Sequence, residues 1–525
     1  MDRSSAGISG QYATSDNGYN QPNGHAPSSG RGRYRHATVR QWNHPPRTAP
    51  GRNEFYHSSG TRSSQHLQCR SVNSAQDFNA LIKPEIMAGL VRKSDRFGHR
   101  YDGRDHGLYA SSVKKYTLAA KRPLNRAEQS QLMRLLQNFA ATRSWNWRSL
   151  TTTFHSLTSA GVFTPHKPMD ERVKHTQAAL LSTLLDAIRF KCSKKADARD
   201  IDAQGIANLL WAMTKLADIA REPTPGLNET VTALLPYVKA QKANFKQQGI
   251  TNLLWATAKL ADNGQEQTAR FKEAMAALLP FVNALKANFN PQEIANLLWA
   301  TAKPGELLEL NIVTTAFESL IYRISETPQL SQQDIWMSLW GVMVWCARLS
   351  LISNANQNSV IEKYMDDLFT RLENTSPNNE DEQSIIALAA SWLGRACPIV
   401  PHYLRTMSQP QAEFRDQLQS CIPSLKIEEE KYLNSLPPVD LLLPDHNMVI
   451  EIQGPFHYVC GDFKTRNGST LLKIALLKKA GFEVIEIPAN TVWDQDSIKP
   501  CIDQIKTREG ASRLESESTG DPLAD

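Results

Sequence analysis

The sequence predicts a mainly α-helical protein, in which an α-solenoid of about 44-residue helical-hairpin repeats follows a disordered N-terminus and precedes a small C-terminal α/β domain. Three observations predict this class. A pentapeptide recurs in phase in the middle of the chain, short apolar runs flank a helical pattern after residue 437, and residues 1–75 are poor in aliphatic side chains. At 525 residues, the chain is long enough for two or three domains.

Residues 1–75 are rich in Ser, Gly, Asn, Gln and Arg. Such a segment cannot bury enough apolar surface to offset its ordering entropy, so we expect it to be disordered. Its nine Arg and three acidic residues give it a net charge of +6, which equals the formal net charge of the whole chain. The remaining residues are neutral in sum, and any affinity of the folded part for phosphate must come from local basic patches.

The same segment is a candidate targeting leader. An acid-poor stretch with Arg and Ser is typical of an organelle transit peptide, and it also resembles the Ser-rich leader of a bacterial type III secreted effector; a plain solvated tail is the third interpretation. We expect an intracellular protein, because the seven Cys are scattered and form no CxxC pair. No apolar run approaches the roughly 18–20 residues of a transmembrane helix, so we expect no membrane insertion.

Helical periodicity predicts an N-terminal helical region at 76–195 and a helical repeat array at 196–400. The pentapeptide Asn-Leu-Leu-Trp-Ala occurs at 208–212, 252–256 and 296–300, a period of 44 residues. Apolar residues around it have the spacing of an amphipathic helix, and a second helix follows. A unit this small must stack on its neighbours to bury its apolar face.

The Ala-Asn-Leu-Leu-Trp-Ala-x-x-Lys core of these units resembles the octotricopeptide-type repeats of organellar RNA factors and of some bacterial effectors. The resemblance covers about 200–305, with weaker copies to about 395. It implies a surface that binds single-stranded RNA.

Positions that keep the register form rows along one face of the array. The lysine row is a candidate phosphate contact, or a set of solvated residues near the C-terminal end of each helix dipole. The asparagine row is a candidate for bonds to base edges, or for bonds between repeats, and the tryptophan row is expected in the core. These rows are Lys215, Lys259 and Lys303; Asn208, Asn252 and Asn296; and Trp211, Trp255 and Trp299.

Residues 437–507 are predicted to form the α/β domain, after a linker at 401–436. Short strands are expected at 439–443 and 448–453 around a turn, then a helix at 468–480, a third strand at 482–487 and a closing helix at 498–505. The order is β-β-α-β-α. The acidic tail at 508–525 is expected to be disordered.

This segment resembles the RAP domain, an RNA-associated module similar to the PD-(D/E)xK nuclease core. The matching residues are Val439-Asp440-Leu441, Ile450 to His457, Gly468 to Lys473, Gly481 to Val484, and Ile487-Pro488.

Strand geometry predicts a polar site in this domain. Successive strand residues point to opposite faces, so Glu451 and Gln453 share one face while Ile450 and Ile452 pack beneath. If the first two strands pair as a hairpin, Asp440 approaches Glu451. The result is a D…ExQ arrangement.

Metal-assisted cleavage of RNA needs hard oxygen ligands, and Asp440 and Glu451 are candidate ligands for Mg²⁺ or Mn²⁺. Nucleases of this class usually have Lys where Gln453 stands, and Lys473 is a candidate to supply the ammonium. His457 is a candidate proton carrier or phosphate donor. Alternatively, the two carboxylates bond turn amides and His457 caps a strand.

Three functions follow from these features. The first is an RNA-binding protein, in which the array holds single-stranded RNA and the C-terminal domain, with Lys464 and Arg466 in a basic patch, assists recognition or processing. The second is a divalent-metal RNA endonuclease that uses Asp440, Glu451 and Gln453. The third is a scaffold or secreted effector that binds host or organellar proteins.

Overall fold

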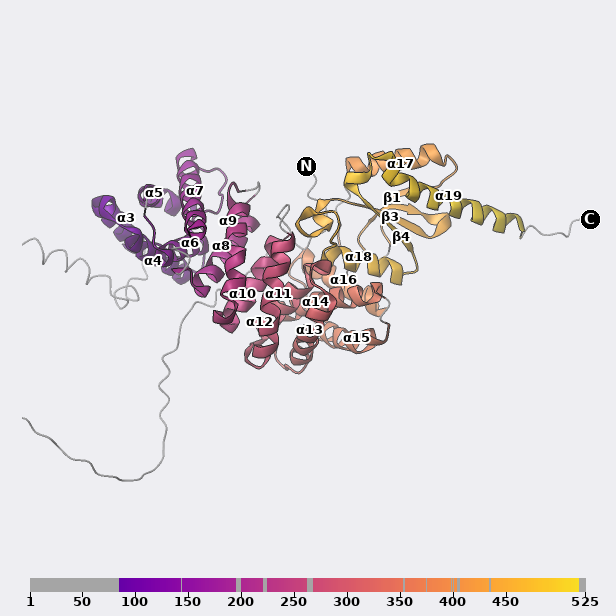
Figure 1. The fold of residues 1–525 in the computed structure, drawn as a ribbon, viewed down its shortest axis with the longest axis horizontal. Helices are drawn as coiled ribbons and strands as arrows, with labels where there is room; N and C mark the ends of the chain where they lie inside the picture. The colour runs from indigo at the N-terminus through magenta and orange to yellow at the C-terminus, as the bar shows by residue number, and fades with distance from the viewer. Residues whose placement is uncertain are drawn as a thin grey trace, which may run out of the picture. The chain divides into compact units, whose positions relative to one another are not determined.

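The computed structural model describes residues 85–518 except 143, 195–199, 221–223, 262–267, 353–354, 374, 398, 400, 404–406 and 434–435. The predicted leader at 1–75 lies outside these residues. The described chain is mostly helical and has a four-stranded sheet near its C-terminus (Figure 1). Within the described part, no helix combines the length and apolarity needed to cross a membrane.

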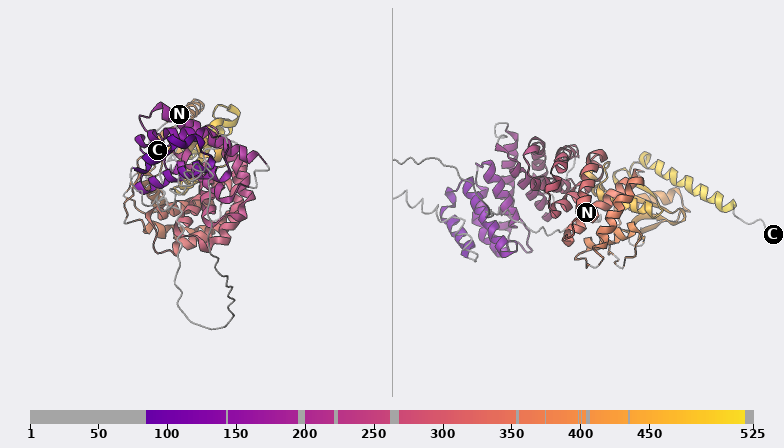
Figure 2. Two further views of the ribbon diagram at one scale, coloured as in Figure 1. Left: turned by 90° about the vertical axis from the view of Figure 1, so that its left-hand side faces the viewer. Right: turned by 90° about the horizontal axis from the view of Figure 1, so that it is seen from below.

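Before residue 400 the helices form two layers, because alternate helices pack on one another in chain order (Figure 2). One set, here called the A layer, is α4 (Gly103–Ala120), α6 (Trp147–Ser159), α8 (Ala203–Ile219), α10 (Gln247–Leu260), α12 (Pro291–Ala302), α14 (Gln332–Leu351) and α16 (Glu380–Leu393). The other, the B layer, is α3 (Glu85–Phe97), α5 (Arg126–Ala140), α7 (Glu171–Ser193), α9 (Leu227–Ala240), α11 (Thr268–Leu285), α13 (Leu310–Ser325) and α15 (Ala355–Thr370).

The 44-residue period of the sequence corresponds to one A helix and one B helix in this packing. Ile206, Leu209 and Leu210 of α8 are fully buried, and α10 and α12 bury the same register positions. Full burial of one such side chain stabilises the fold by roughly 1.5–3 kcal/mol. Side-chain caps begin the helices, as where Asp202 accepts a hydrogen bond from the backbone N–H of Gly205 at 2.7 Å.

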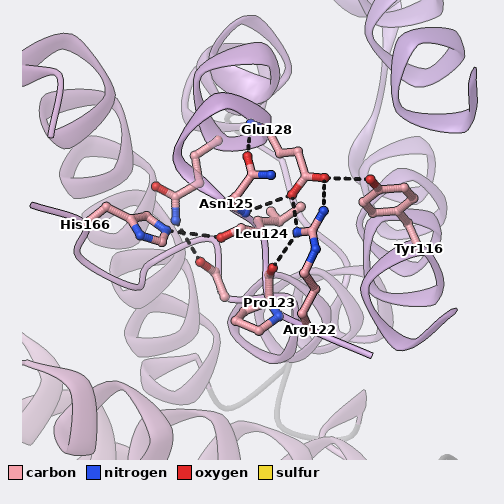
Figure 3. A network of polar contacts seen from close by, with 9 residues as sticks. Tyr116, Arg122, Pro123, Leu124, Asn125, Glu128 and His166 are labelled. Carbon is pink, nitrogen blue, oxygen red and sulfur yellow. Dashed lines mark hydrogen bonds and ion pairs between the residues drawn. The ribbon is translucent and has the colours of Figure 1, made fainter. Parts of the chain in front are cut away.

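A polar network joins α4 to the start of α5 (Figure 3). The Glu128 carboxylate accepts a hydrogen bond from Asn125 N at 2.8 Å and one from each terminal nitrogen of Arg122 at 2.8 Å. Tyr116 of α4 donates to the same carboxylate at 2.6 Å. Arg122 lowers the pKa of Glu128 to about 2, so the network keeps its charge at any physiological pH.

The C-terminal domain, residues 407–518, surrounds a sheet of order β1-β2-β3-β4. Strand β2 is antiparallel to β1 and to β3, whereas β4 is parallel to β3. Its elements are α17 (Gln409–Cys421), β1 (Glu428–Lys431), β2 (Val439–Leu443), β3 (Met448–Gln453), α18 (Gly468–Lys479), β4 (Glu483–Pro488) and α19 (Gln495–Ser518).

The bounds of this domain differ from the predicted ones at both ends. The segment 401–436 is not a linker throughout, because α17 and β1 lie in it, and Phe414 and Leu418 of α17 belong to the hydrophobic core under the sheet. At the other end, α19 continues past Arg508 to Ser518, into the segment predicted to be a disordered tail. The strands and helix predicted between 439 and 487 agree with β2, β3, α18 and β4 to within one residue.

The C-terminal domain is docked closely on the A layer. Helix α18 packs against α14 and α16, and Gly468 N donates to the backbone oxygen of Lys303 at 2.9 Å. A Cβ atom at Gly468 would lie 2.6 Å from the backbone oxygen of Ala302. Only glycine therefore allows α18 to approach α12 this closely.

We predict that Gly468→Ala destabilises the protein by about 1–3 kcal/mol, because the added methyl group collides with backbone that cannot move aside. Chemical denaturation of the full chain measures this change. Gly454→Ala is the matched control, since the nearest atom to its Cβ lies 4.0 Å away, and its effect is expected to stay within about 0.5 kcal/mol. Equal stability of the two variants would contradict the prediction.

Candidate functional site

The predicted hairpin brings the two acidic residues together. Strands β2 and β3 pair with Leu441 opposite Ile450, which places Asp440 beside the end of β3 that carries Glu451. Asp440 Oδ2 accepts a hydrogen bond from Ile452 N at 2.6 Å. The carboxylate of Asp440 is thus fixed by the backbone of β3, whereas the alternative interpretation had expected a turn amide.

The two faces of β3 differ as predicted. Ile450 and Ile452 belong to the hydrophobic core of the domain, whereas Glu451 and Gln453 point to the other face, toward α18. Both polar residues are only 1% exposed. The D…ExQ group is therefore a buried site.

Lys473 of α18 supplies a positive charge to this site. Its Nζ lies 2.6 Å from Glu451 Oε2 and also donates to the backbone oxygen of Pro438 at 2.9 Å. Helix α18 is positioned by Asn467, whose side chain caps it at Thr470 N. The structure thus brings Lys473 to the acidic residues, and its role as the ammonium of a nuclease site stays a prediction.

Three polar atoms of this buried centre have no hydrogen-bond partner among the described residues. They are Glu451 Oε1, Gln453 Nε2 and Gln453 Oε1. A buried polar group without a partner costs about 1–3 kcal/mol. The centre therefore has unused capacity to bind a small polar species such as water.

The charges of the centre balance when it holds one proton. Burial raises the pKa of Glu451 to about 8 against the opposing charge of Lys473, and the carboxylate of Asp440 adds to the rise. Burial alone would lower the pKa of Lys473, but Glu451 and Asp440 outweigh it and the pKa is raised. Burial also raises the pKa of Asp440, and the charge of Lys473 opposes that rise. The buried centre thus favours one bound proton over two ionised carboxylates beside a single ammonium.

His457 lies at the same edge of the sheet. Burial lowers its pKa to about 4, with a smaller contribution from the charge of Lys473, so the ring is neutral at physiological pH. Thr470 Oγ1 donates to the backbone oxygen of His457 at 2.9 Å. A neutral imidazole is not a phosphate-binding cation, and its role as a proton carrier stays a prediction.

The residues of this centre fit a divalent metal poorly. Asp440, Glu451 and Gln453 offer oxygen atoms, but the Lys473 ammonium already lies against Glu451 and would repel a second cation. Across the described ranges, no group of three His, Cys, Asp or Glu side chains is arranged to hold a metal ion. The chemistry that this centre supports is proton storage and hydrogen bonding.

The two candidate RNA-binding residues of this domain, Lys464 and Arg466, differ in how accessible they are. Lys464 is exposed. Arg466 is not available in the same way, because it forms ion pairs with Glu306 at 2.6 Å and with Glu486 at 2.8 Å. Arg466 thus joins the C-terminal domain to the segment after α12, which contradicts its expected place in an open RNA-binding patch.

The three lysines of the predicted row have different surroundings. Lys303 is 6% exposed and lies under the C-terminal domain. Lys259 forms an ion pair with Asp218 at 2.9 Å, and the ammonium of Lys215 lies 5.7 Å from the ring centroid of Trp255. The ammonium groups of Lys215 and Lys259 thus contribute to the array by cation–π contact and ion pairing. The phosphate-binding role of this row stays a prediction.

The other two rows agree better with expectation. Trp255 and Trp299 are buried, at 6% and 1% exposure, and their ring centroids lie 6.4 Å apart. Trp211 is half-buried. The asparagines of the pentapeptide are all half-buried on the accessible side of their helices, and Asn208 accepts a hydrogen bond from Gln204 of its own helix at 3.0 Å.

Sequence reasoning missed the residues that complete the buried centre. Gln411 of α17 donates to Glu430 of β1 at 2.9 Å and to the backbone oxygen of Asp440 at 3.0 Å. Glu430 also raises the pKa of Glu451. Both residues lie in the predicted linker, and the composition Glu-Glu-Glu-Lys of β1 carries no strand signal.

Comparison with known protein families identifies the core of this domain. The RAP domain family matches residues 450–495. A RAP domain is therefore present. It spans β3, α18 and β4, so it contains Glu451, Gln453, His457 and Lys473. RAP domains are associated with RNA binding. No curated protein matches the chain.

We predict that Lys473→Met destabilises the protein by about 3–5 kcal/mol at neutral pH, because it leaves the buried Asp440 and Glu451 pair without its counter-charge. Urea denaturation measures the loss. Lys478→Met is the matched control, since Lys478 is exposed on the same helix and its replacement is expected to cost less than about 0.5 kcal/mol. Adding Asp440→Asn to Lys473→Met should recover part of the loss; no recovery would contradict the charge assignment.

The raised pKa of Glu451 predicts a pH dependence of stability. The folded state holds a proton that the unfolded state has released, so stability falls as pH rises from about 4.5 to about 8, by up to about 1.4 kcal/mol per pH unit. Glu451→Gln should flatten this slope. Denaturation midpoints at a series of pH values test it, and an unchanged slope in the variant would sink the assignment.

Proposed function

We propose that this protein binds single-stranded RNA and does not hydrolyse it. The helical layers form an α-solenoid whose A layer holds the RNA, and the RAP domain extends that surface and assists recognition. The resemblance of the pentapeptide units to octotricopeptide-type repeats gives the same expectation.

The observation that carries the proposal is the position of the RAP domain. An RNA-associated domain packs through α18 directly on α14 and α16 of the A layer, and its loop before α18 contacts α10 through Cys460 N and the backbone oxygen of Ala261 at 2.6 Å. The A layer and the RAP domain are thus in direct contact at α10, α14 and α16. An RNA strand that lies on α8 and α10 meets the RAP domain next.

A binding role without cleavage follows from the buried centre. Lys473 lies against Glu451, where its charge opposes a metal ion, and Glu451 and Gln453 are covered. The centre is better suited to hold β2, β3 and α18 together than to meet a phosphodiester. The similarity of this domain to a nuclease core is then a similarity of fold and not of activity.

We predict that the full chain binds labelled single-stranded RNA with an affinity that falls on adding salt. Because the folded part is neutral in sum, the slope of log K against log salt should be shallow, about two to four phosphates at roughly −0.7 each. The measurement is filter binding, and the control is a chain whose nine leader arginines are replaced by glutamine. Loss of all binding in that control would contradict binding by the array.

Incubation of the same RNA with Mg²⁺ or Mn²⁺ separates the binding protein from the endonuclease. We expect the natural chain to cleave no more RNA than the Glu451→Ala variant does. Cleavage by the natural chain alone would overturn the non-hydrolytic role. RNA crosslinking from cells separates RNA binding from the scaffold function. A protein that acted only as a scaffold would yield no crosslinked RNA.

A further inference from the structure

Two aromatic rings of the RAP domain are exposed to solvent. Phe456 is 54% exposed and Trp493 is 55% exposed, and they are the exposed large hydrophobic residues of 450–495, a range that the structure describes throughout. The other bulky apolar side chains of this range are buried or half-buried. These two rings are therefore exceptions to the packing of their own domain.

Both rings lie beyond the carboxyl end of the parallel strand pair. Strand β3 ends at Gln453 and β4 ends at Pro488, and these two residues are opposite each other in the register. Phe456 comes three residues after the first of them and Trp493 five residues after the second. One exposed ring is common on a protein surface, but two rings after paired strand ends mark the edge at which α/β sheets usually bind ligands.

The segment that carries Phe456 is held in place although its ring is exposed. The backbone oxygen of Phe456 accepts a hydrogen bond from Asn467 Nδ2 at 2.7 Å, and Asn467 also caps α18. The backbone oxygen of Pro455 accepts from Tyr458 N at 3.2 Å. A ring on such a fixed segment loses little conformational entropy when a ligand contacts it.

Trp493 is anchored in a similar way. Val492, the residue before it, is fully buried in the core of the domain, and its backbone oxygen accepts from Gln417 Nε2 of α17 at 3.3 Å. Asp494, the residue after it, donates its backbone N–H to Thr491 O at 3.0 Å. The exposed position of the ring is thus set by bonded and buried residues on both sides.

An exposed cation accompanies the first ring. The loop that carries Lys464 folds back beside the segment of Phe456, because a Cβ atom at Gly461 would lie 3.4 Å from Pro455 Cβ. Lys464 is exposed, and its backbone N–H is fixed by Asp462 Oδ1 at 2.9 Å. Its ammonium is suited to the phosphate of a nucleotide whose base lies on the ring.

The surroundings of the rings favour a nucleobase over a protein surface. A protein interface needs a contiguous apolar patch, whereas the residues that follow Trp493, from Asp494 to Asp496, are polar and exposed. Stacking needs only one planar ring, and every base offers a planar face. Because the two aspartates repel a phosphate backbone, we expect Phe456 to contribute more than Trp493.

We propose that Phe456 and Trp493 stack on unpaired bases of the bound RNA, with Lys464 against a phosphate. This inference rests on the proposed RNA binding and names the residues through which the RAP domain contributes to it. The polar side chains at this end of β3, Glu451 and Gln453, are buried, so the site stacks on bases without reading their edges.

Filter binding of the full chain to two RNA strands of equal length tests the proposal. One strand has a mixed sequence, and the other has the same phosphates and riboses but abasic sites in place of the bases. We expect the first to bind at least about tenfold more tightly, because only its bases can stack. Equal binding of the two strands overturns stacking and leaves RNA binding standing. Failure of both strands to bind overturns both proposals.

Variants assign the stacking to the RAP domain. Phe456→Ala with Trp493→Ala should weaken binding of the mixed strand at least about tenfold and leave binding of the abasic strand unchanged. Phe456→Trp with Trp493→Phe keeps both rings and should restore binding. Tyr322→Ala is the matched control, since Tyr322 is 57% exposed on α13 of the B layer, and it should change neither affinity. Far-ultraviolet circular dichroism checks that each variant is folded.

Crosslinking gives an independent measurement. A strand that carries 4-thiouridine is bound to the natural chain and irradiated, and the modified peptides are mapped by mass spectrometry. We expect crosslinks in the peptides that contain Phe456 and Trp493. Crosslinks confined to the helical layers, or an unchanged affinity ratio in the double alanine variant, would overturn the stacking site while RNA binding by the array remained.

Discussion

The apolar face of a helical hairpin can be buried only against another hairpin, and this constraint organises the chain from α3 onward. Each A helix has apolar residues on all sides but one, so it needs a neighbour before it, a neighbour after it and a B helix behind it. The last members, α14 and α16, receive part of this cover from α18 instead. The RAP domain is thereby a structural continuation of the helical layers.

Backbone contact, more than side-chain packing, fixes that junction. Gly468 and Gly305 both lie where a Cβ would collide with the opposing backbone, at 2.6 Å from Ala302 O and 2.3 Å from Arg466 O respectively. The hydrogen bond from Gly468 N to the Lys303 oxygen uses a carbonyl that a helix end leaves without an intrahelical partner. The helix end and the domain therefore satisfy each other, and the junction allows little relative movement.

The elements with a clear local pattern could be predicted from the sequence. Short apolar runs around a turn predicted β2 and β3, and the phased pentapeptide predicted α8, α10 and α12. A hairpin between β2 and β3 was enough to place Asp440 near Glu451. Strand β1 has three consecutive glutamates and is held by long-range partners such as Arg415 and Gln411, so no local signal reveals it. The partner of Arg466 is equally hidden, because Glu306 is 160 residues away in the sequence.

The misplaced lysine row shows why register alone does not identify a binding surface. Lys215, Lys259 and Lys303 occupy one sequence register, yet the first contacts aromatic rings, the second an aspartate, and the third lies under another domain. Equivalence in sequence becomes equivalence in space only where the neighbours are also equivalent. That condition fails at the C-terminal ends of α8, α10 and α12, because the RAP domain covers Lys303 and leaves Lys215 and Lys259 half-buried.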